Sequence, residues 1–119
     1  MTRIFVELPS FRTEWKNMGL TEADLRRLQE ELLTNPAVGS VMQETGAVRK
    51  MRFAFEHRGK SGSVRVIYVD FLAYEKLYLL TAYPKSEKDN LTKKERNELK
   101  KLVEALKSEL EKKEGGKKK

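Results

Sequence analysis

Positively charged side chains are concentrated in one stretch of the chain, residues 48–65. This stretch carries six Lys and Arg against one Glu, a local charge of +5, while the whole chain has a formal net charge of +7 with its single His neutral. A patch of one sign on a rigid surface costs stability through self-repulsion unless a polyanion neutralises it, and nucleic acid is the usual polyanion. RNA or DNA is therefore the first partner to consider for these cations, which are Arg49, Lys50, Arg52, Arg58, Lys60 and Arg65.

The spacing of the cations predicts that some of them share one face of a β-sheet. Met51 and Phe53 alternate with Lys50 and Arg52, which is the period of two that sends successive side chains to opposite faces of a strand. One face of residues 48–56 is therefore expected to be apolar and the other cationic.

A hairpin is expected to bring Arg65 to the same cationic face. If Glu56 faces Ser63 across the turn, Ala54 lies opposite Arg65, and Arg65 then projects on the side of Lys50. This register is an assumption, since a slip of one residue would send Arg65 to the other face.

Composition bounds the class of protein. A chain of 119 residues suits one domain, expected at 1–114 and followed by a disordered basic tail at 115–119. The absence of Cys excludes disulfides and thiolate chemistry, and one His excludes a multi-histidine metal site, so no cofactor is expected. No apolar run approaches the roughly 20 residues that a membrane span needs, which favours a cytoplasmic protein with no membrane partner.

Turn and cap signals give the element order β-α-α-β-β-β-α. Strands are expected at 2–8, 48–56, 63–71 and 76–83, because β-branched and aromatic residues dominate these runs. A helix capped by Ser10 and anchored by Trp15 is expected to form a hairpin with a second helix, which Thr21 and Asp24 cap. Residues 37–47 are expected to be a connection with turns at glycines. Thr92 and Glu95 form the capping box of a terminal helix whose apolar stripe contains Leu99, Leu102, Val103, Leu106 and Leu110.

This order of elements, together with several segments, resembles the RelE/ParE superfamily of bacterial toxins, and most closely its HigB-like branch. The matching segments are VRKMR at 48–52, RGKSG at 58–62, VRVIY at 64–68 and YLLTAYPKSE at 78–87, followed by Leu91 and Thr92. The resemblance implies a small α+β RelE-like fold, with an antiparallel sheet packed by an N-terminal helical hairpin and a C-terminal helix.

The resemblance implies that the protein is an mRNA interferase, the toxin of a type II toxin–antitoxin pair, which cuts messenger RNA on the ribosome. The implied partners are the ribosome, mRNA and a cognate antitoxin of the HigA or RelB kind with a DNA-binding domain. Carried over by position, Lys50 and Arg52 match the basic positions of the family's second strand, Arg65 matches the arginine of the third, and Lys85 follows the fourth. Leu91 stands where RelE-type members can have a tyrosine, and Tyr83 is taken as its substitute.

Cleavage by the 2′-hydroxyl of RNA needs a base, positive charge for the phosphorane and an acid for the 5′-oxygen. Arginine forks suit phosphate oxygens, and crowded cations disfavour one another's charged forms, so a lysine among arginines could move a proton. We therefore expect Arg65 to stabilise the transition state, Lys50 or Arg52 to position the phosphate, with Lys50 a possible base, and Lys85 to act as acid or further stabiliser. Around this site, Arg49, Arg58 and Lys60 are expected to bind RNA.

Two alternatives remain open at this point. One is the gyrase-poisoning ParE-like branch of the same superfamily, which generally lacks the basic set. The other is a non-catalytic RNA-binding module that uses the same charge for phosphate contacts alone; its binding would depend strongly on salt but would leave the RNA intact.

Overall fold

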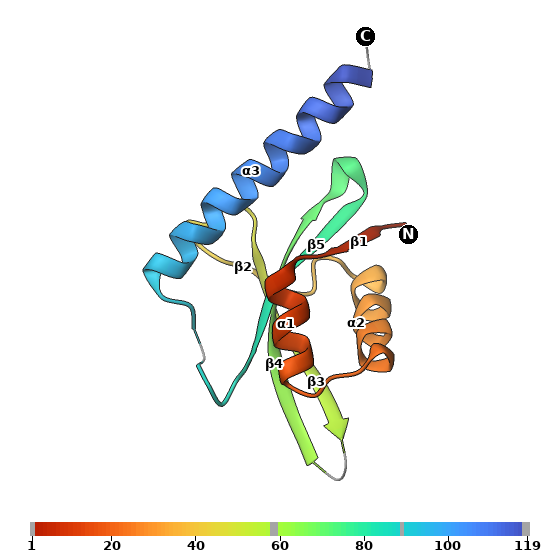
Figure 1. Ribbon diagram of the computed structural model, residues 1–119, viewed down its shortest axis with the longest axis vertical. Helices are drawn as coiled ribbons and strands as arrows, with labels where there is room; N and C mark the ends of the chain where they lie inside the picture. Colours follow the sequence, from red (N-terminus) through yellow and green to blue (C-terminus); the bar gives the residue numbers. More distant parts are fainter. Residues whose placement is uncertain (1, 58–59, 89, 118–119) are drawn as a thin grey trace.

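The computed structural model describes residues 2–57, 60–88 and 90–117, and it has the predicted α+β architecture (Figure 1). Its elements are β1 (Ile4–Glu7), α1 (Pro9–Asn17), α2 (Glu22–Thr34), β2 (Ser40–Val41), β3 (Arg49–His57), β4 (Lys60–Phe71), a 3-10 turn (Leu72–Tyr74), β5 (Lys76–Pro84) and α3 (Lys93–Lys117). Helix α3 continues past the predicted domain boundary at residue 114, and disorder of the tail remains a prediction.

The five strands form one sheet in the order β1-β5-β4-β3-β2. The meander of β3, β4 and β5 is antiparallel, as expected, whereas β1 pairs with β5 in parallel, so the sheet is mixed. The predicted connection at 37–47 also contains a strand, β2, which was missed because two residues carry no readable alternation. Strand β4 is therefore central, with paired neighbours on both sides.

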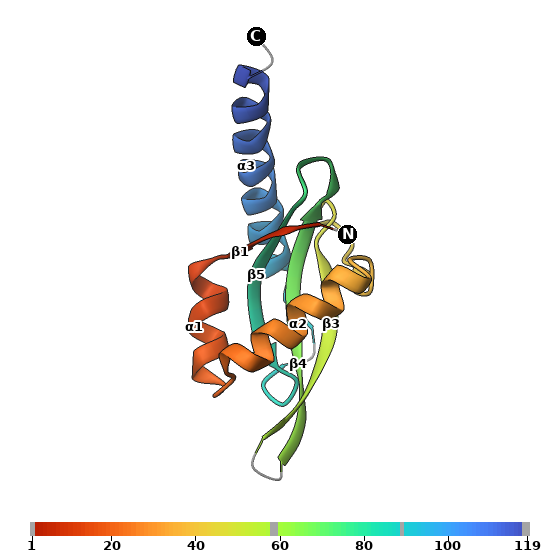
Figure 2. The same ribbon diagram turned by 90° about the vertical axis from the view of Figure 1, so that its right-hand side faces the viewer.

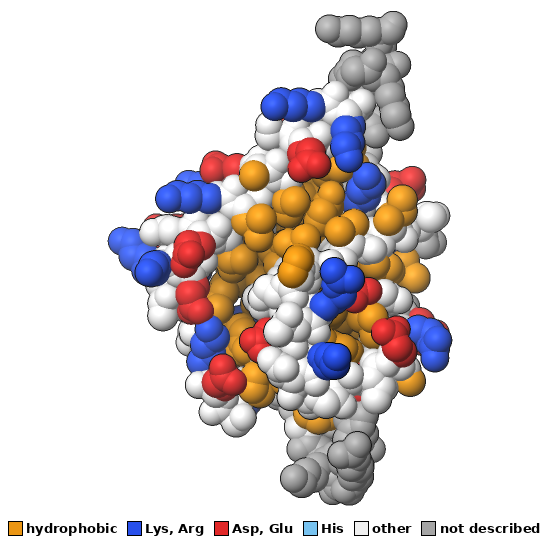
Figure 3. Space-filling view, in the orientation of Figure 1, with side chains coloured by type: hydrophobic (Ala, Val, Ile, Leu, Met, Phe, Trp, Pro, Cys, Tyr) orange, Lys and Arg blue, Asp and Glu red, His pale blue; other side chains and the backbone are white. Residues whose placement is uncertain are grey.

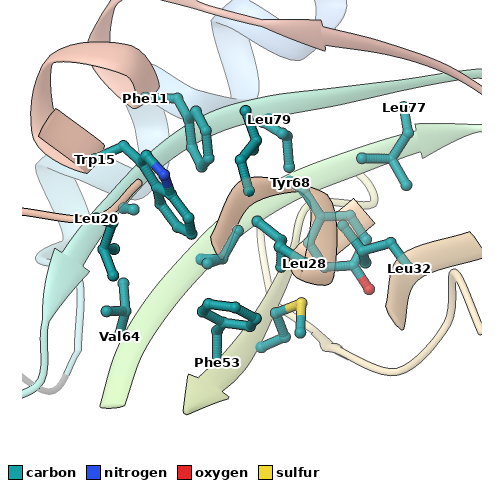
Figure 4. Close-up of a cluster of buried hydrophobic side chains, with 14 residues drawn as sticks. Phe11, Trp15, Leu20, Leu28, Leu32, Phe53, Val64, Tyr68, Leu77 and Leu79 are labelled. Atoms are coloured by element: carbon teal, nitrogen blue, oxygen red, sulfur yellow. The ribbon is translucent and has the colours of Figure 1, made fainter. Parts of the chain in front are cut away.

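Helices α1 and α2 cover one face of the sheet (Figure 2). Trp15 of α1 stacks on Phe11 with ring centroids 5.2 Å apart and reaches Phe53 of β3 at 5.7 Å, which confirms its predicted role as an anchor. Leu28 and Leu32 of α2 are fully buried in the same cluster, as Figure 4 shows. Burying a side chain of this size contributes roughly 1.5–3 kcal/mol, so this face supplies much of the folding free energy.

Helix α3 covers part of the opposite face, and Figure 1 shows α2 and α3 on opposite sides of the sheet. Val103 and Leu110 are buried in the same hydrophobic cluster as Ile67 and Val69 of β4. A band of hydrophobic side chains lies along α3 in Figure 3, and Leu102 keeps 36% of its surface exposed. No helix among the described residues is long and apolar enough to cross a membrane.

The helix caps agree with the sequence at α2 and α3 but not at α1. Thr21 and Asp24 exchange the two hydrogen bonds of a capping box, as do Thr92 and Glu95. The predicted cap of α1 by Ser10 is wrong, because the helix already begins at Pro9, whose missing N–H and restricted φ suit a first helical position. The Ser10 hydroxyl instead lies 2.8 Å from the Thr81 hydroxyl of β5.

The Glu95 cap should contribute to stability in a pH-dependent way. Hydrogen bonds from Lys88 and from the Thr92 backbone lower the pKa of Glu95, so the ionised carboxylate stabilises the fold above the ordinary Glu pKa. This contribution is lost as the pH falls through the lowered value. We expect Glu95→Gln to lower the melting temperature by about 2–4 °C at neutral pH, and by less near pH 3, in thermal denaturation followed by circular dichroism. Glu104→Gln, on the exposed side of α3, is the matched control; an equal loss from Glu95→Gln at both pH values would contradict this assignment.

Candidate functional site

Three of the predicted catalytic cations meet on the sheet face that α3 only partly covers. Arg52 of β3 pairs directly with Arg65 of β4, and Lys50 pairs with Ile67, one step further along the same face. The predicted register, which placed Ala54 opposite Arg65, is wrong by two residues. Because side chains alternate with a period of two, a shift of two leaves the face unchanged, and the prediction that the three cations share a face is confirmed.

These cations line a cleft of about 600 Å³. Its walls come from three parts of the chain: strands β3 and β4, the segment that contains β2, and the loop between β5 and α3. The side chains that line the cleft include Val38, Ser40, Lys50, Arg52, Arg65 and Asn90.

The three cations occupy different depths of the cleft. Arg65 is only 2% exposed, and its Nη1 donates to Ser63 Oγ at 3.4 Å, so the guanidinium forms part of the floor. Arg52 is exposed at the rim, and half-buried Lys50 donates from Nζ to Asn90 Oδ1 at 2.9 Å. All three residues belong to hydrogen-bonded strands. Their backbone positions are therefore held more firmly than they would be in a loop.

The direct pairing of Arg52 with Arg65 is unfavourable for the folded protein alone. Cross-strand neighbours have Cβ atoms only about 4.5–5.5 Å apart, and like charges in this position destabilise a sheet. A bound anion would offset this repulsion by attracting both guanidinium groups, and arginine forks match phosphate oxygens in geometry. The cleft is therefore suited to a phosphate group.

Tyr83 and Lys85 lie near the cleft but are not among the described residues that line it. Tyr83 pairs with Arg65 from β5, yet its ring is 4% exposed and packs in the cluster beneath α3, with Lys88 Nζ 5.1 Å from the ring centroid. Lys85 follows the end of β5 with an exposed side chain, and its backbone N–H donates to the Ser63 carbonyl. Lys85 thus lies two residues beyond Tyr83, just past the end of β5.

Of the three residues predicted to bind RNA around the site, the structure describes the side chain of Arg49 alone. Arg49 shares the phase of Met51, so it projects to the opposite face, where its Nη1 donates to the Gly39 carbonyl at 2.6 Å and to the Ala37 carbonyl at 3.4 Å. Arg58 lies outside the described residues. The Lys60 backbone belongs to β4, but its side chain is also outside the described part.

A buried clamp holds the β2 wall of the cleft. The Tyr68 hydroxyl donates to the Pro36 carbonyl at 2.7 Å and accepts from the Gly39 N–H at 3.0 Å. Burial raises the pKa of Tyr68, which keeps its hydroxyl protonated for the bond to Pro36. Gly39 is required here, because a Cβ at this position would lie 2.9 Å from the Lys50 carbonyl and 3.0 Å from the Tyr68 ring.

Sequence reasoning missed Val38, Ser40 and Asn90 as cleft residues. Val38 and Ser40 belong to a stretch without periodicity, and their place depends on the pairing of Ser40 with Lys50 across the β2–β3 ladder. Asn90 precedes a helix cap in a loop. The glycine at 39 was a usable signal, although it indicates a close backbone approach rather than the expected turn.

Comparison with known proteins is consistent with this architecture. The family model described as the RelE toxin of the RelE / RelB toxin-antitoxin system matches residues 3–114. Among solved structures, the chain is similar to a mutant of the E. coli toxin RelE in the free state, in which two arginines are replaced by alanine. That match has a TM-score of 0.51 and 13% sequence identity, and it covers 75% of this chain and 90% of the other, so it shows a shared fold. Since the family model spans nearly the whole chain, the protein belongs to the RelE toxin family.

Proposed function

We propose that this toxin is a ribosome-dependent mRNA endoribonuclease that inhibits translation. The observation that carries the proposal is the Arg52–Arg65 pair beside Lys50 in one cleft, an arrangement that costs stability and suits a phosphodiester. Family membership implies an antitoxin partner. In this proposal the antitoxin is of the HigA or RelB kind, and the toxin acts in the cytoplasm.

The proposed reaction is an attack by the ribose 2′-oxygen on the adjacent phosphorus. The P–O5′ bond breaks, the products are a 2′,3′-cyclic phosphate and a 5′-hydroxyl, and the proton lost by the 2′-hydroxyl is balanced by one supplied to the 5′-oxygen. Charge develops on the two non-bridging oxygens of the phosphorane, so fixed cations accelerate the step more than they strengthen binding of the substrate.

The depth of each side chain supports a division of roles. Arg65, buried at the floor and oriented from the central strand, is assigned to the charge on the phosphorane. Exposed Arg52 is assigned to capture and positioning of the phosphate, and Lys50, held by Asn90, to positioning or proton transfer.

Lys85 remains the proposed acid or further stabiliser, because it emerges beyond Tyr83 at the end of β5. The assignment of Tyr83 as acid or base has less support, because this side chain is buried beneath α3 and lines a different pocket. In the proposal Tyr83 supports Arg65 from the neighbouring strand.

The first test is the removal of the Arg65 charge with its length retained. Arg65→Met should lower cleavage by about 10²–10³-fold, because a preorganised donor to the transition state is lost. The measurement is growth, together with mapping of RNA 5′ ends, after induction in bacterial cells. Wild type should produce new in-frame cuts within translated messages, and Arg65→Met should not.

Arg12→Met, on exposed α1, is the matched control and should cut as wild type does. Melting of purified Arg65→Met checks that it folds; if it does not, Arg52→Ala replaces it at the exposed rim. Growth arrest with intact messages would contradict the proposed nuclease activity and favour gyrase as the target. Intact messages with normal growth would favour a non-catalytic RNA-binding module.

A second prediction concerns the trade between stability and binding at Arg52. Arg52→Gln should raise the free energy of unfolding by about 0.5 kcal/mol at low salt, because the repulsion with Arg65 is relieved. The gain should shrink at about 0.5 M salt, where the charges are screened. In the same variant the slope of log affinity for RNA against log salt concentration should fall by about one.

Chemical denaturation and fluorescence anisotropy at several salt concentrations measure the two effects. Arg12→Gln is the control, and it should change neither. A loss of stability in Arg52→Gln at low salt, or an unchanged salt slope, would show that Arg52 serves the fold rather than a polyanion.

A further inference from the structure

We infer that the wall of the cleft formed by Val38 and Ser40 is a subsite for a nucleobase of the RNA, next to the cations that hold its phosphate. The inference rests on the proposed function, since it takes RNA as the ligand. It assigns a role to residues that belong neither to the cationic set nor to the hydrophobic core.

The two sides of the cleft differ in chemistry. One side presents Lys50, Arg52 and Arg65, while the other presents the apolar Val38 and the hydroxyl of Ser40. A nucleotide has the same division, with a charged phosphate and an apolar ring whose edge carries donors and acceptors. A site for phosphate alone has no use for an apolar wall, whereas every base offers a face to an apolar side chain.

Val38 is an apolar residue that is exposed in the cleft and not buried in the hydrophobic core. Its side chain keeps 42% of its surface accessible and lines the cleft, although its neighbour Gly39 is held in the interior. Water therefore covers an apolar surface in the free protein, and displacing this water with a base is favourable.

The distance between the two sides fits adjoining parts of one nucleotide chain. Ser40 pairs directly with Lys50 across the β2–β3 ladder, which places their Cβ atoms about 4.5–5.5 Å apart. A base joined through its ribose to a phosphate at Lys50 thus lies against the β2 wall rather than in open solvent.

The wall is rigid, as a recognition surface must be. Gly39 stands between Val38 and Ser40, and both of its backbone groups are bonded: the N–H to Tyr68 and the carbonyl to Arg49. Arg49, counted as an RNA ligand from the sequence, is in this inference a positioning residue for the base subsite. Ordering a wall before the ligand arrives lowers the entropy cost of binding.

Val41 provides an internal contrast. It is also an exposed valine, 54% accessible, but it pairs with Arg49 and lines a different pocket, beside Leu72. Nonspecific hydrophobic binding of RNA by this segment would involve both valines, whereas a base subsite involves Val38 only.

The experiment compares binding of two 2′-O-methyl oligoribonucleotides of equal length, one with bases and one abasic, to the purified protein. The 2′-O-methyl group blocks cleavage, so only binding is measured. Wild type should prefer the base-containing strand by about tenfold. Val38→Ala and Ser40→Ala should each reduce this preference by about threefold or more, with affinity for the abasic strand unchanged, and Val41→Ala should behave as wild type.

Tyr68→Phe tests the positioning role. It removes the hydroxyl that holds the wall, so it should reduce the preference for bases while a melting curve shows that the protein still folds. A variant that merely disturbed the fold would lose affinity for both strands in parallel.

The subsite is overturned if Val38→Ala keeps the wild-type preference for bases, or if it weakens the binding of both strands equally. The result of this binding experiment is independent of the test for RNA cleavage. A wild type that cuts messages but shows no preference for bases keeps the proposed activity and loses the subsite, and the reverse pattern keeps the subsite and loses the activity.

Discussion

Burial of strand β4 on both faces is the constraint on which the rest of the structure depends. Val64, Val66 and Tyr68 face the α1–α2 layer, while Ile67 and Val69 face α3, so a strand that is central in the sheet is also central between two helical layers. If such a strand slipped by one residue, the apolar side chains that face the α1–α2 layer would turn toward α3, and those that face α3 would turn toward α1 and α2. The register of β3 and β5 against it follows, and with it the position of every side chain in the cleft.

Arg65 is the one buried cation that this strand carries among the described residues. A guanidinium in a central strand, placed directly opposite Arg52, contributes less to the stability of the fold than an apolar side chain of the same length would. The sheet tolerates it because the apolar positions around it, on both faces, supply ample burial. Departures from the rules of stability are expected at functional sites, and this one lies in the central strand of the sheet.

The sequence predicts the fold and the cationic face well, because alternation over nine residues of β3 determines which side chains share a face. It does not determine register, since shifts of two residues preserve the same alternation, and the hairpin was placed two residues away from its true pairing. It also overcounts the charge of the site. Arg49 lies on the same face of β3 as Met51, opposite the face of Lys50 and Arg52. A count of cations along the sequence nevertheless includes it. The β2 wall could not be predicted, because its position depends on the Tyr68 hydroxyl reaching Pro36 and Gly39, far away in the sequence.

These observations change the description of the site from a basic patch to a cleft with two kinds of wall. A patch of six cations would bind any polyanion with an affinity set by charge and salt alone. Among the side chains that the structure describes, Lys50, Arg52 and Arg65 line the cleft, whereas Arg49 holds the segment that contains β2. In the base subsite that we propose, the apolar and hydroxyl surface beside three cations would distinguish a nucleotide from a bare phosphate, because only the nucleotide fills both sides. In this proposal the cations attract the RNA, and the clamp built on Tyr68 and Gly39 holds the wall that fixes the position of a base.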